Sequence, residues 1–240
     1  WVPQMAGSAA VLAGISRVPG VSYAALTPNM RGFEDALAAR ADEVAIFGSA
    51  SEGFSRANIN ASIEESLARF APVAEAARVA GIPMRGYVSC VSDCPYDGPV
   101  APEAVARVAA ALAEMGCYEV SLGDTIGQAT PERIDAMLAA VCEVVPAQKL
   151  AGHYHDTGRR ALDNIEVSLA RGLRVFDAAV GGLGGCPYAP GAAGNVATEA
   201  VAERLAALGY DTRLDLGIVA RAADMARAMR LETGTRESGK

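Results

Sequence analysis

Short runs of apolar and β-branched residues alternate with longer stretches whose apolar positions recur at helical spacing, from one end of the chain to the other. We expect each of six such runs to form a strand that a helix follows. The expected strands lie near Ser22–Leu26, Glu43–Phe47, Met84–Ser89, Glu119–Leu122, Lys149–Tyr154 and Arg174–Asp177. Strict alternation of strand and helix is typical of a parallel sheet covered by helices, and therefore indicates the α/β class.

Several expected helices carry recognisable boundary signals. Ser62 with Glu65 three residues later matches a capping box, and Thr130-Pro131 places proline in the first turn of a helix. Glycines stand where other helices should end. These glycines are Gly81, Gly116, Gly172 and Gly209.

Two parallel architectures fit this pattern, a doubly wound open sheet and a TIM (β/α)8 barrel. No G-x-G-x-x-G sequence follows the first strand, which weakens the dinucleotide-binding alternative and favours the barrel. A barrel needs eight strands and six are visible, so we expect the first strand and most of the second to be missing. The missing part would be about 45 residues at the usual size of a βα unit. We expect residues 1–230 to form one barrel domain and residues 231–240 a polar tail. A shorter open sheet that is complete as written is the alternative.

The amino-acid composition limits the classes of partner that the protein is expected to bind. The formal charge is −7 and the basic residues are scattered, which argues against nucleic acid or an anionic membrane and favours small molecules. No apolar run reaches the roughly 20 residues that span a bilayer, and no signal-like segment opens the chain. Five cysteines without regular spacing indicate reduced thiols. We therefore expect a soluble protein of a bacterial cytoplasm, with a mitochondrial location fitting less well.

Both histidines of the chain, His153 and His155, lie two residues apart at the end of an apolar run. On a strand this spacing points both imidazoles to the same side, where they could bind one metal ion. The following Asp156 adds to the polar character of this strand end. A coincidental or surface pair of histidines is the alternative.

Active sites of such barrels lie at the carboxyl ends of the strands, where several polar residues of this chain are expected. Most of the serines and threonines there are explained by turn formation. Asp124 stands out, because an acid between a strand and a turn at the barrel mouth suits metal-linked or acid/base chemistry. Capping of the next helix explains Asp124 equally well.

A glycine-rich stretch, residues 181–195, follows the last expected strand and carries Cys186 near its middle. Its glycines would allow the backbone to close over a ligand, so Cys186 is a candidate acid/base or nucleophile. Asn195 and Glu199 fall four apart, and we expect both on one face of the helix that starts there. The Asn195 carbonyl could bind a metal ion or simply cap the helix. Cys90 and Cys94 have no second pair, which makes a structural zinc site improbable.

Six stretches of the chain together resemble the 3-hydroxy-3-methylglutaryl-CoA lyase family. They are Trp1–Met5, Asn58–Ser66 (NINASIEES), Arg85–Tyr96 (RGYVSCVSDCPY), Met115–Gly127 (MGCYEVSLGDTIG), Gly152–Thr157 (GHYHDT) and Gly182–Glu199 (GLGGCPYAPGAAGNVATE). The resemblance implies a TIM barrel that cleaves 3-hydroxy-3-methylglutaryl-CoA into acetyl-CoA and acetoacetate with Mg²⁺ or Mn²⁺. It also implies an acyl-CoA substrate as partner, in an enzyme that commonly forms a homodimer.

The resemblance assigns roles residue by residue. His153, His155 and Asn195 match three metal ligands, and Cys186 matches the catalytic cysteine of the loop. Asp124 matches a catalytic acid/base. Glu199 matches a residue that supports the site. In the reaction so implied, Asp124 or His153 takes the proton of the tertiary hydroxyl, the C–C bond breaks, and Cys186 protonates the resulting enolate.

The chain also departs from the family pattern. The Arg-Asp-Gly motif of the family's first strand, which supplies a fourth metal ligand and a substrate-polarising arginine, is not present, nor is a glutamate of its second strand. The usual Tyr-Gly-Gln after the histidine segment is replaced by Gly158-Arg159-Arg160. Two alternatives stay open beside the lyase. One is a lyase for another hydroxyacyl-CoA or a Claisen-type acyl-CoA synthase on the same barrel, and the other is an inactive metal-binding remnant. The GLGGCPY loop favours the lyase over the synthase.

Overall fold

Six parallel strands form one curved sheet in the computed structural model, which describes residues 7–184 and 194–237. The strands lie side by side in the order β1-β2-β3-β6-β7-β8, so the sheet is built by adding each new strand to the same edge. Their bounds are β1 Ala24–Leu26, β2 Glu43–Ser49, β3 Met84–Ser89, β6 Val120–Asp124, β7 Leu150–Tyr154 and β8 Val175–Asp177. This order is that of consecutive βα units.

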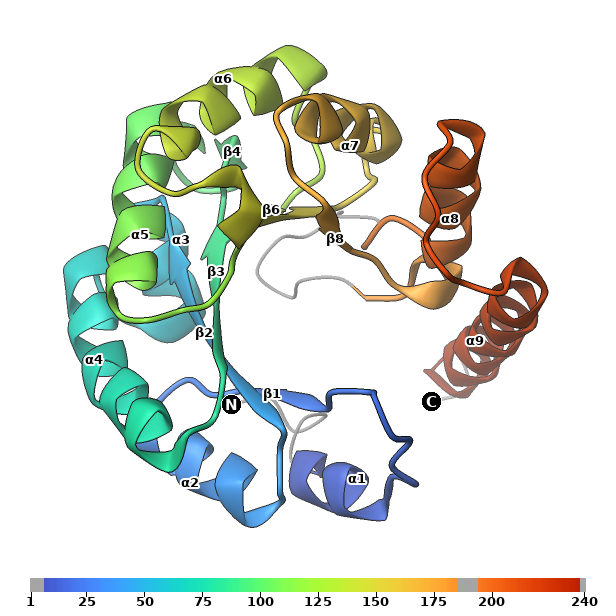
Figure 1. Cartoon of the computed structure of the whole chain (residues 1–240), viewed down its shortest axis with the longest axis horizontal. Helices are drawn as coiled ribbons and strands as arrows, with labels where there is room; N and C mark the ends of the chain where they lie inside the picture. Colours follow the sequence, from blue (N-terminus) through green and yellow to red (C-terminus); the bar gives the residue numbers. More distant parts are fainter. Residues whose placement is uncertain (1–6, 185–193, 238–240) are drawn as a thin grey trace.

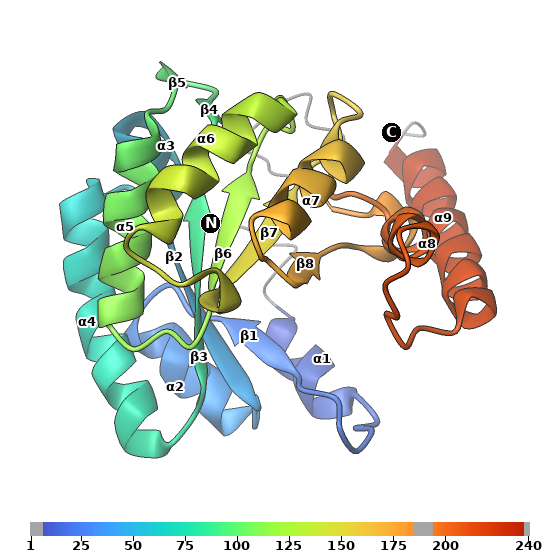
Figure 2. The same ribbon diagram turned by 45° about the horizontal axis from the view of Figure 1, so that its top comes forward.

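Helices cover the outer side of the sheet, where α4, α5, α6 and α7 follow the arc of the strands (Figures 1 and 2). The first helices are α1 Ser8–Gly14, α2 Met30–Ala38, α3 Glu52–Ile59, α4 Ile63–Ala80 and α5 Pro102–Glu114. The later ones are α6 Pro131–Cys142, α7 Ala161–Ala170, α8 Thr198–Ala207 and α9 Leu216–Glu237, with short 3-10 turns η2 Ala147–Lys149 and η3 Val180–Gly182.

The six predicted strands are confirmed, with ends that differ from the prediction by at most two residues. The capping box is also confirmed: the Ser62 hydroxyl accepts from the Glu65 backbone N–H, and the Glu65 carboxylate accepts from the Ser62 N–H. Thr130 caps α6, with Pro131 as its first residue. The four predicted helix-ending glycines all have positive φ, as a left-handed end requires.

A small antiparallel pair, β4 Asp93–Cys94 and β5 Gly98–Pro99, is not predicted by the sequence pattern. Strands of two residues are too short to show a periodicity. The pair lies beyond the end of β3, where Cys90, Cys94 and Phe54 form a small buried cluster of their own.

The sheet is an arc rather than a closed ring in the described part of the chain. β1 pairs only with β2 and β8 only with β7, and each of these edge strands is three residues long. Leu26 of β1 is 56% exposed and Val175 of β8 is 39% exposed. Six parallel strands in barrel order establish an α/β fold with part of a TIM barrel, and the expectation of two further strands stays a prediction.

The two faces of the sheet differ in chemistry. The outer face packs against the helices through apolar side chains such as Val88, Leu122 and Leu150, which belong to one large core cluster. Tyr154 joins this cluster, and its buried hydroxyl bonds to Ser168 of α7. Because side chains alternate along a strand, the neighbours of these residues project to the concave side of the arc.

No helix within residues 7–184 and 194–237 combines the length and the apolar character that crossing a membrane would require.

Gly152 lies in β7, the strand that carries His153, and the packed aromatic rings around it leave no room for a larger side chain. A Cβ at this position would lie 2.9 Å from the Tyr154 ring and 3.0 Å from the Phe176 ring. We expect Gly152→Ala to lower the free energy of unfolding by about 1–3 kcal/mol through overpacking, as measured by urea denaturation. Gly14→Ala in α1 is the matched control, since a Cβ there meets nothing within 4 Å. Equal stability of the two variants would contradict this packing.

Candidate active site

Three neighbouring strands bring His153 and Asp177 together at their carboxyl ends. In the sheet register His153 of β7 lies between Gly123 of β6 and Asp177 of β8. His153 and Asp177 meet on the concave side of the sheet, and Gly123 adds no side chain there. The His153 Nδ1 atom lies 3.0 Å from Asp177 Oδ2. This contact occupies Nδ1 and leaves Nε2 of His153 as the atom for a ligand.

Asp177 is fixed through both of its carboxylate oxygens. Oδ2 also accepts from the Ser121 hydroxyl at 2.7 Å, while Oδ1 lies 2.8 Å from Arg85 Nη1. Burial by itself would raise the pKa of Asp177, but the hydrogen bond from His153 and the charge of Arg85 outweigh it and lower the pKa below its ordinary value. Asp177 is therefore an ionised carboxylate that can hold the imidazole in one tautomer.

His155 lies on the same side of the chain as His153, with ring centroids 5.6 Å apart. Its side chain is buried, and burial, with a smaller contribution from His153, lowers its pKa to about 4. At neutral pH the imidazole is therefore uncharged and keeps a lone pair. Its Nδ1 atom is buried and has no hydrogen-bond partner among the described residues. A bound cation would remove the cost of that unpaired nitrogen.

Asn195 is brought to His155 by backbone pairing. The two residues form an isolated antiparallel bridge, and the neighbouring amides of Asp156 and Val196 donate to the carbonyls of Gly194 and Tyr154. The Asn195 amide nitrogen donates to the Leu183 carbonyl at 3.0 Å, which leaves the side-chain oxygen for a ligand. The prediction that Asn195 and Glu199 share a helix face is wrong, since α8 begins at Thr198 and Asn195 lies in the bridge before it.

These three residues fit a divalent cation. The two imidazoles offer Nε2 of His153 and Nδ1 of His155, and Asn195 adds an amide oxygen. Such a mixed nitrogen and oxygen set suits Mg²⁺, Mn²⁺ or another first-row ion. No group of three or more His, Cys, Asp or Glu side chains placed to hold a metal occurs in the described part of the chain.

Asp124 does not join this group. Its carboxylate accepts backbone N–H groups of Gly127, Gln128 and Ala129, and thereby anchors the turn between β6 and α6. It follows Leu122 by two residues and so projects toward the helix layer, away from the concave side. Burial raises its pKa to about 6. These bonds agree with the alternative that Asp124 serves the following helix, and its acid/base role stays a prediction.

Glu199 contacts Gly181, at the start of the glycine-rich stretch, and Arg227 of α9. Its carboxylate accepts from the Gly181 backbone at 3.1 Å and pairs with Arg227 of α9 at 2.9 Å. It thus connects η3, where the loop begins, to α8 and α9, in agreement with a supporting role. Cys186 lies outside the described residues.

Other polar residues at the strand ends take the turn and capping roles that the sequence offered as their explanation. Asn29 caps α2 and Ser51 caps α3 through side-chain oxygens. The Thr125 hydroxyl accepts from the Cys90 backbone. Among the described residues, Cys90, Cys94 and Cys117 are buried thiols, and Cys142 is a partly buried one.

Asp177, Arg85 and Ser121 are not among the residues that the sequence identifies as a site. A signal exists for Asp177, because it is the last residue of a predicted strand and the histidines end the preceding one. Arg85 lacks such a signal. It lies near the start of β3, and only the curvature of the sheet carries its side chain to β8.

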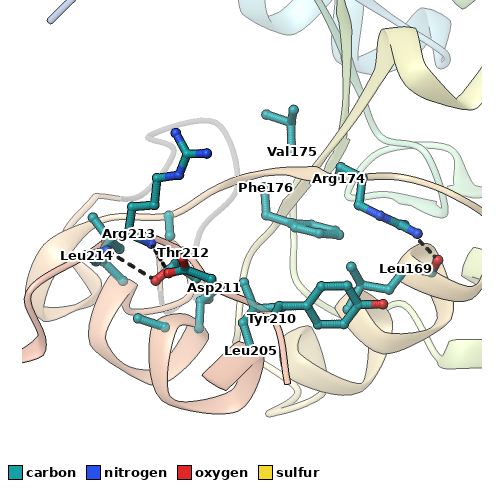
Figure 3. A pocket seen from close by; sticks show the side chains of 14 residues that line it. Leu169, Arg174, Val175, Phe176, Leu205, Tyr210, Asp211, Thr212, Arg213 and Leu214 are labelled. Atoms are coloured by element: carbon teal, nitrogen blue, oxygen red, sulfur yellow. Dashed lines mark hydrogen bonds between the residues drawn. The ribbon is translucent and has the colours of Figure 1, made fainter. Parts of the chain in front are cut away.

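A groove of about 610 Å³ lies on the other side of β8. Phe176 and Tyr210 project toward it from β8 and from the segment between α8 and α9 (Figure 3). Phe176 precedes Asp177 and therefore faces the opposite side of the sheet. The groove is lined mainly by apolar residues and contains neither histidine, so it is separate from the candidate active site.

The chain matches the model of the HMGL-like family over residues 1–226. It is 58% identical over 216 residues to a 3-hydroxy-3-isohexenylglutaryl-CoA/hydroxymethylglutaryl-CoA lyase of Pseudomonas aeruginosa, across 90% of this chain and 72% of that protein. It is 56% identical over 220 residues to the hydroxymethylglutaryl-CoA lyase of Pseudomonas mevalonii, across 92% and 73% of the two chains.

Solved structures agree with these relatives. The HMG-CoA lyase of Brucella melitensis superimposes with a TM-score of 0.94 at 61% identity, covering 96% of this chain and 82% of that one. The carboxyl transferase domain of Rhizobium etli pyruvate carboxylase is only 16% identical, with a TM-score of 0.62, and shows a shared fold alone. The family match over nearly all of the chain and the high identity of these lyases lead to one conclusion: the chain belongs to the HMGL-like family.

Proposed function

We propose that this chain is a divalent-metal-dependent carbon–carbon lyase that cleaves 3-hydroxy-3-methylglutaryl-CoA into acetyl-CoA and acetoacetate. The observation that carries the proposal is the arrangement of His153, His155 and Asn195, in which Asp177 orients one imidazole and the other has an unpaired buried nitrogen. The relatives at 56% and 58% identity are lyases for this substrate by name, which supports the choice of substrate class.

His153, His155 and Asn195 would hold the cation. When bound, Mg²⁺ or Mn²⁺ supplies a Lewis acid and a template for the substrate's oxygen atoms. The uncharged state of His155 at neutral pH keeps its nitrogen available, because its pKa is lowered to about 4. The Asn195 oxygen is directed by the bond from its amide nitrogen to Leu183.

Of the two candidate bases for the tertiary hydroxyl, the structure favours His153. Asp177 lies 3.0 Å from its Nδ1 atom and would stabilise the imidazolium that forms. An imidazole nitrogen cannot bind a cation and a proton at once, so His153 would fill the two roles in turn. Asp124 acts indirectly, by holding the β6 to α6 turn.

Loss of the hydroxyl proton lets the C–C bond break. The hydroxyl-bearing carbon becomes the ketone of acetoacetate, and the electron pair passes to the thioester enolate. Cys186 then donates the proton that converts the enolate into acetyl-CoA. Glu199 supports this step through η3, which leads into the loop that contains Cys186. We also propose, from the resemblance to the lyase family, that the protein forms a homodimer in a bacterial cytoplasm.

A second substrate has specific support. The relative from Pseudomonas aeruginosa is named for 3-hydroxy-3-isohexenylglutaryl-CoA as well. A longer substituent on the same carbon leaves the reacting atoms unchanged, so the same residues could act on both compounds. The ratio of kcat/KM for the two substrates decides between them.

His155→Ala should abolish both stoichiometric metal binding and cleavage of 3-hydroxy-3-methylglutaryl-CoA, because it removes the unpaired ligand atom. Metal content by mass spectrometry and acetyl-CoA release with Mg²⁺ or Mn²⁺ measure the two effects. Asn195→Ala should weaken metal binding in the same assay. Asn29→Ala, which removes an asparagine that only caps α2, is the matched control. Full metal occupancy in His155→Ala would show that the ligand assignment is wrong.

Cys186→Ser should slow turnover by roughly 10²-fold or more, the scale of a lost acid/base catalyst, while metal content stays at the level of the parent. Cys142→Ser at the end of α6 is the control, since that thiol lies outside the site. Turnover of Cys186→Ser within a few-fold of the parent would remove Cys186 from the reaction.

A further inference from the structure

Arg85 connects parts of the site that are not adjacent in the sheet. It belongs to β3, whereas Asp177 belongs to β8, and two strands lie between them. The guanidinium crosses the concave side of the arc and reaches Asp177 Oδ1 at 2.8 Å. We propose that Arg85 is a positioning residue that fixes Asp177 and thereby sets the orientation of His153 and the metal affinity of the site.

The nitrogen atoms of the Arg85 guanidinium contact three different side chains. Nε donates to Glu119 at 2.8 Å, and Nη1 meets both Asp177 and the Tyr87 hydroxyl, the latter at 2.5 Å. The Arg85 and Glu119 side chains are only 10% and 11% exposed. Glu119 holds the arginine from the start of β6, so that the same planar group is presented to Asp177 in one orientation.

Asp177 contacts both Arg85 and His153, so the fixed guanidinium also fixes the imidazole. Because Arg85 takes Oδ1, the other oxygen is left for Ser121 and for Nδ1 of His153. Without the bond from Arg85 to Oδ1, the carboxylate could turn away from Nδ1 of His153, which would then lose its fixed acceptor. With Arg85 in place, the imidazole has one tautomer, with the proton on Nδ1 and a lone pair on Nε2.

Among the described residues, Arg85 bonds to Glu119, Tyr87 and Asp177 and makes no hydrogen bond or ion pair to His155 or Asn195. Its Nη2 atom is buried without a partner among the described residues. An unpaired buried donor is costly. Its retention agrees with a group kept for the geometry of Asp177 rather than for stability.

Two measurements test this role: the tautomer of His153 and the affinity of the protein for Mn²⁺. The chain has two histidines, so ¹⁵N NMR of the metal-free protein at pH 8 can report the tautomer of each, with His155→Ala giving the assignment. We expect the parent to show His153 protonated on Nδ1 and Arg85→Gln to show a mixture of tautomers. Calorimetry with Mn²⁺ should show a Kd about 10–100-fold weaker in Arg85→Gln, the usual effect of removing an outer partner of a metal ligand.

Arg133→Gln is the matched control. It also breaks a close Arg–Asp pair, with Asp93 at 2.7 Å, but has no contact with the Asp177 group. Where Arg85→Gln fails to fold, Arg85→Lys replaces it, because lysine keeps the charge but cannot hold Glu119 and Asp177 in one planar fork. A folded Arg85 variant with the parent's His153 signals and the parent's Mn²⁺ affinity overturns the proposal.

The metal part of this inference rests on the proposed function, but the two can fail separately. A parent protein that binds Mn²⁺ and cleaves no hydroxymethylglutaryl-CoA would refute the substrate and leave the role of Arg85 intact. A parent that binds no Mn²⁺ would refute the metal site. The tautomer of His153 in the metal-free variants would then decide the role of Arg85 alone.

Discussion

The ionised carboxylate of Asp177 is the interaction on which the candidate site depends. One oxygen meets Arg85 and the other meets Ser121 and His153, so residues of β3, β6, β7 and β8 are joined through a single side chain. These contacts exist only because the sheet curves, which brings β3 and β8 within reach of one arginine. The curvature of the sheet therefore determines the orientation of the His153 imidazole, and through it the geometry of the candidate site.

The second half of the site is held by backbone. His155 follows the end of β7, and its bridge with Asn195 ties that strand to the segment before α8. This arrangement places an uncharged imidazole with an unpaired nitrogen beside an amide whose oxygen is free for a ligand. The ligand set thus combines an imidazole fixed by a carboxylate with one fixed by burial. Burial keeps a lone pair of His155 available at neutral pH, while the carboxylate of Asp177 occupies Nδ1 of His153 and leaves Nε2 for a ligand.

The amino-acid sequence predicts most of the fold, because the six strands and the caps at Ser62 and Thr130 are local patterns that tertiary packing agrees with. It predicts His153 and His155 for the same reason, since alternation along a strand is local. It leaves the role of Asp124 open, as polarity alone does not tell a catalytic acid from one that binds three turn amides. Arg85 and Asp177 are 92 residues apart in the chain, so their pairing depends on the curvature of the sheet.

We propose that the oriented imidazole of His153, the buried imidazole of His155 and the amide of Asn195 together hold one divalent cation. Anomalous diffraction from crystals of the protein with Mn²⁺ tests it most directly, because the ion is located without reference to activity. We expect one strong anomalous peak within bonding distance of His153 Nε2, a ring nitrogen of His155 and the Asn195 side-chain oxygen, with Asp177 still bonded to His153 Nδ1. A fully occupied Mn²⁺ that contacts neither histidine would contradict it.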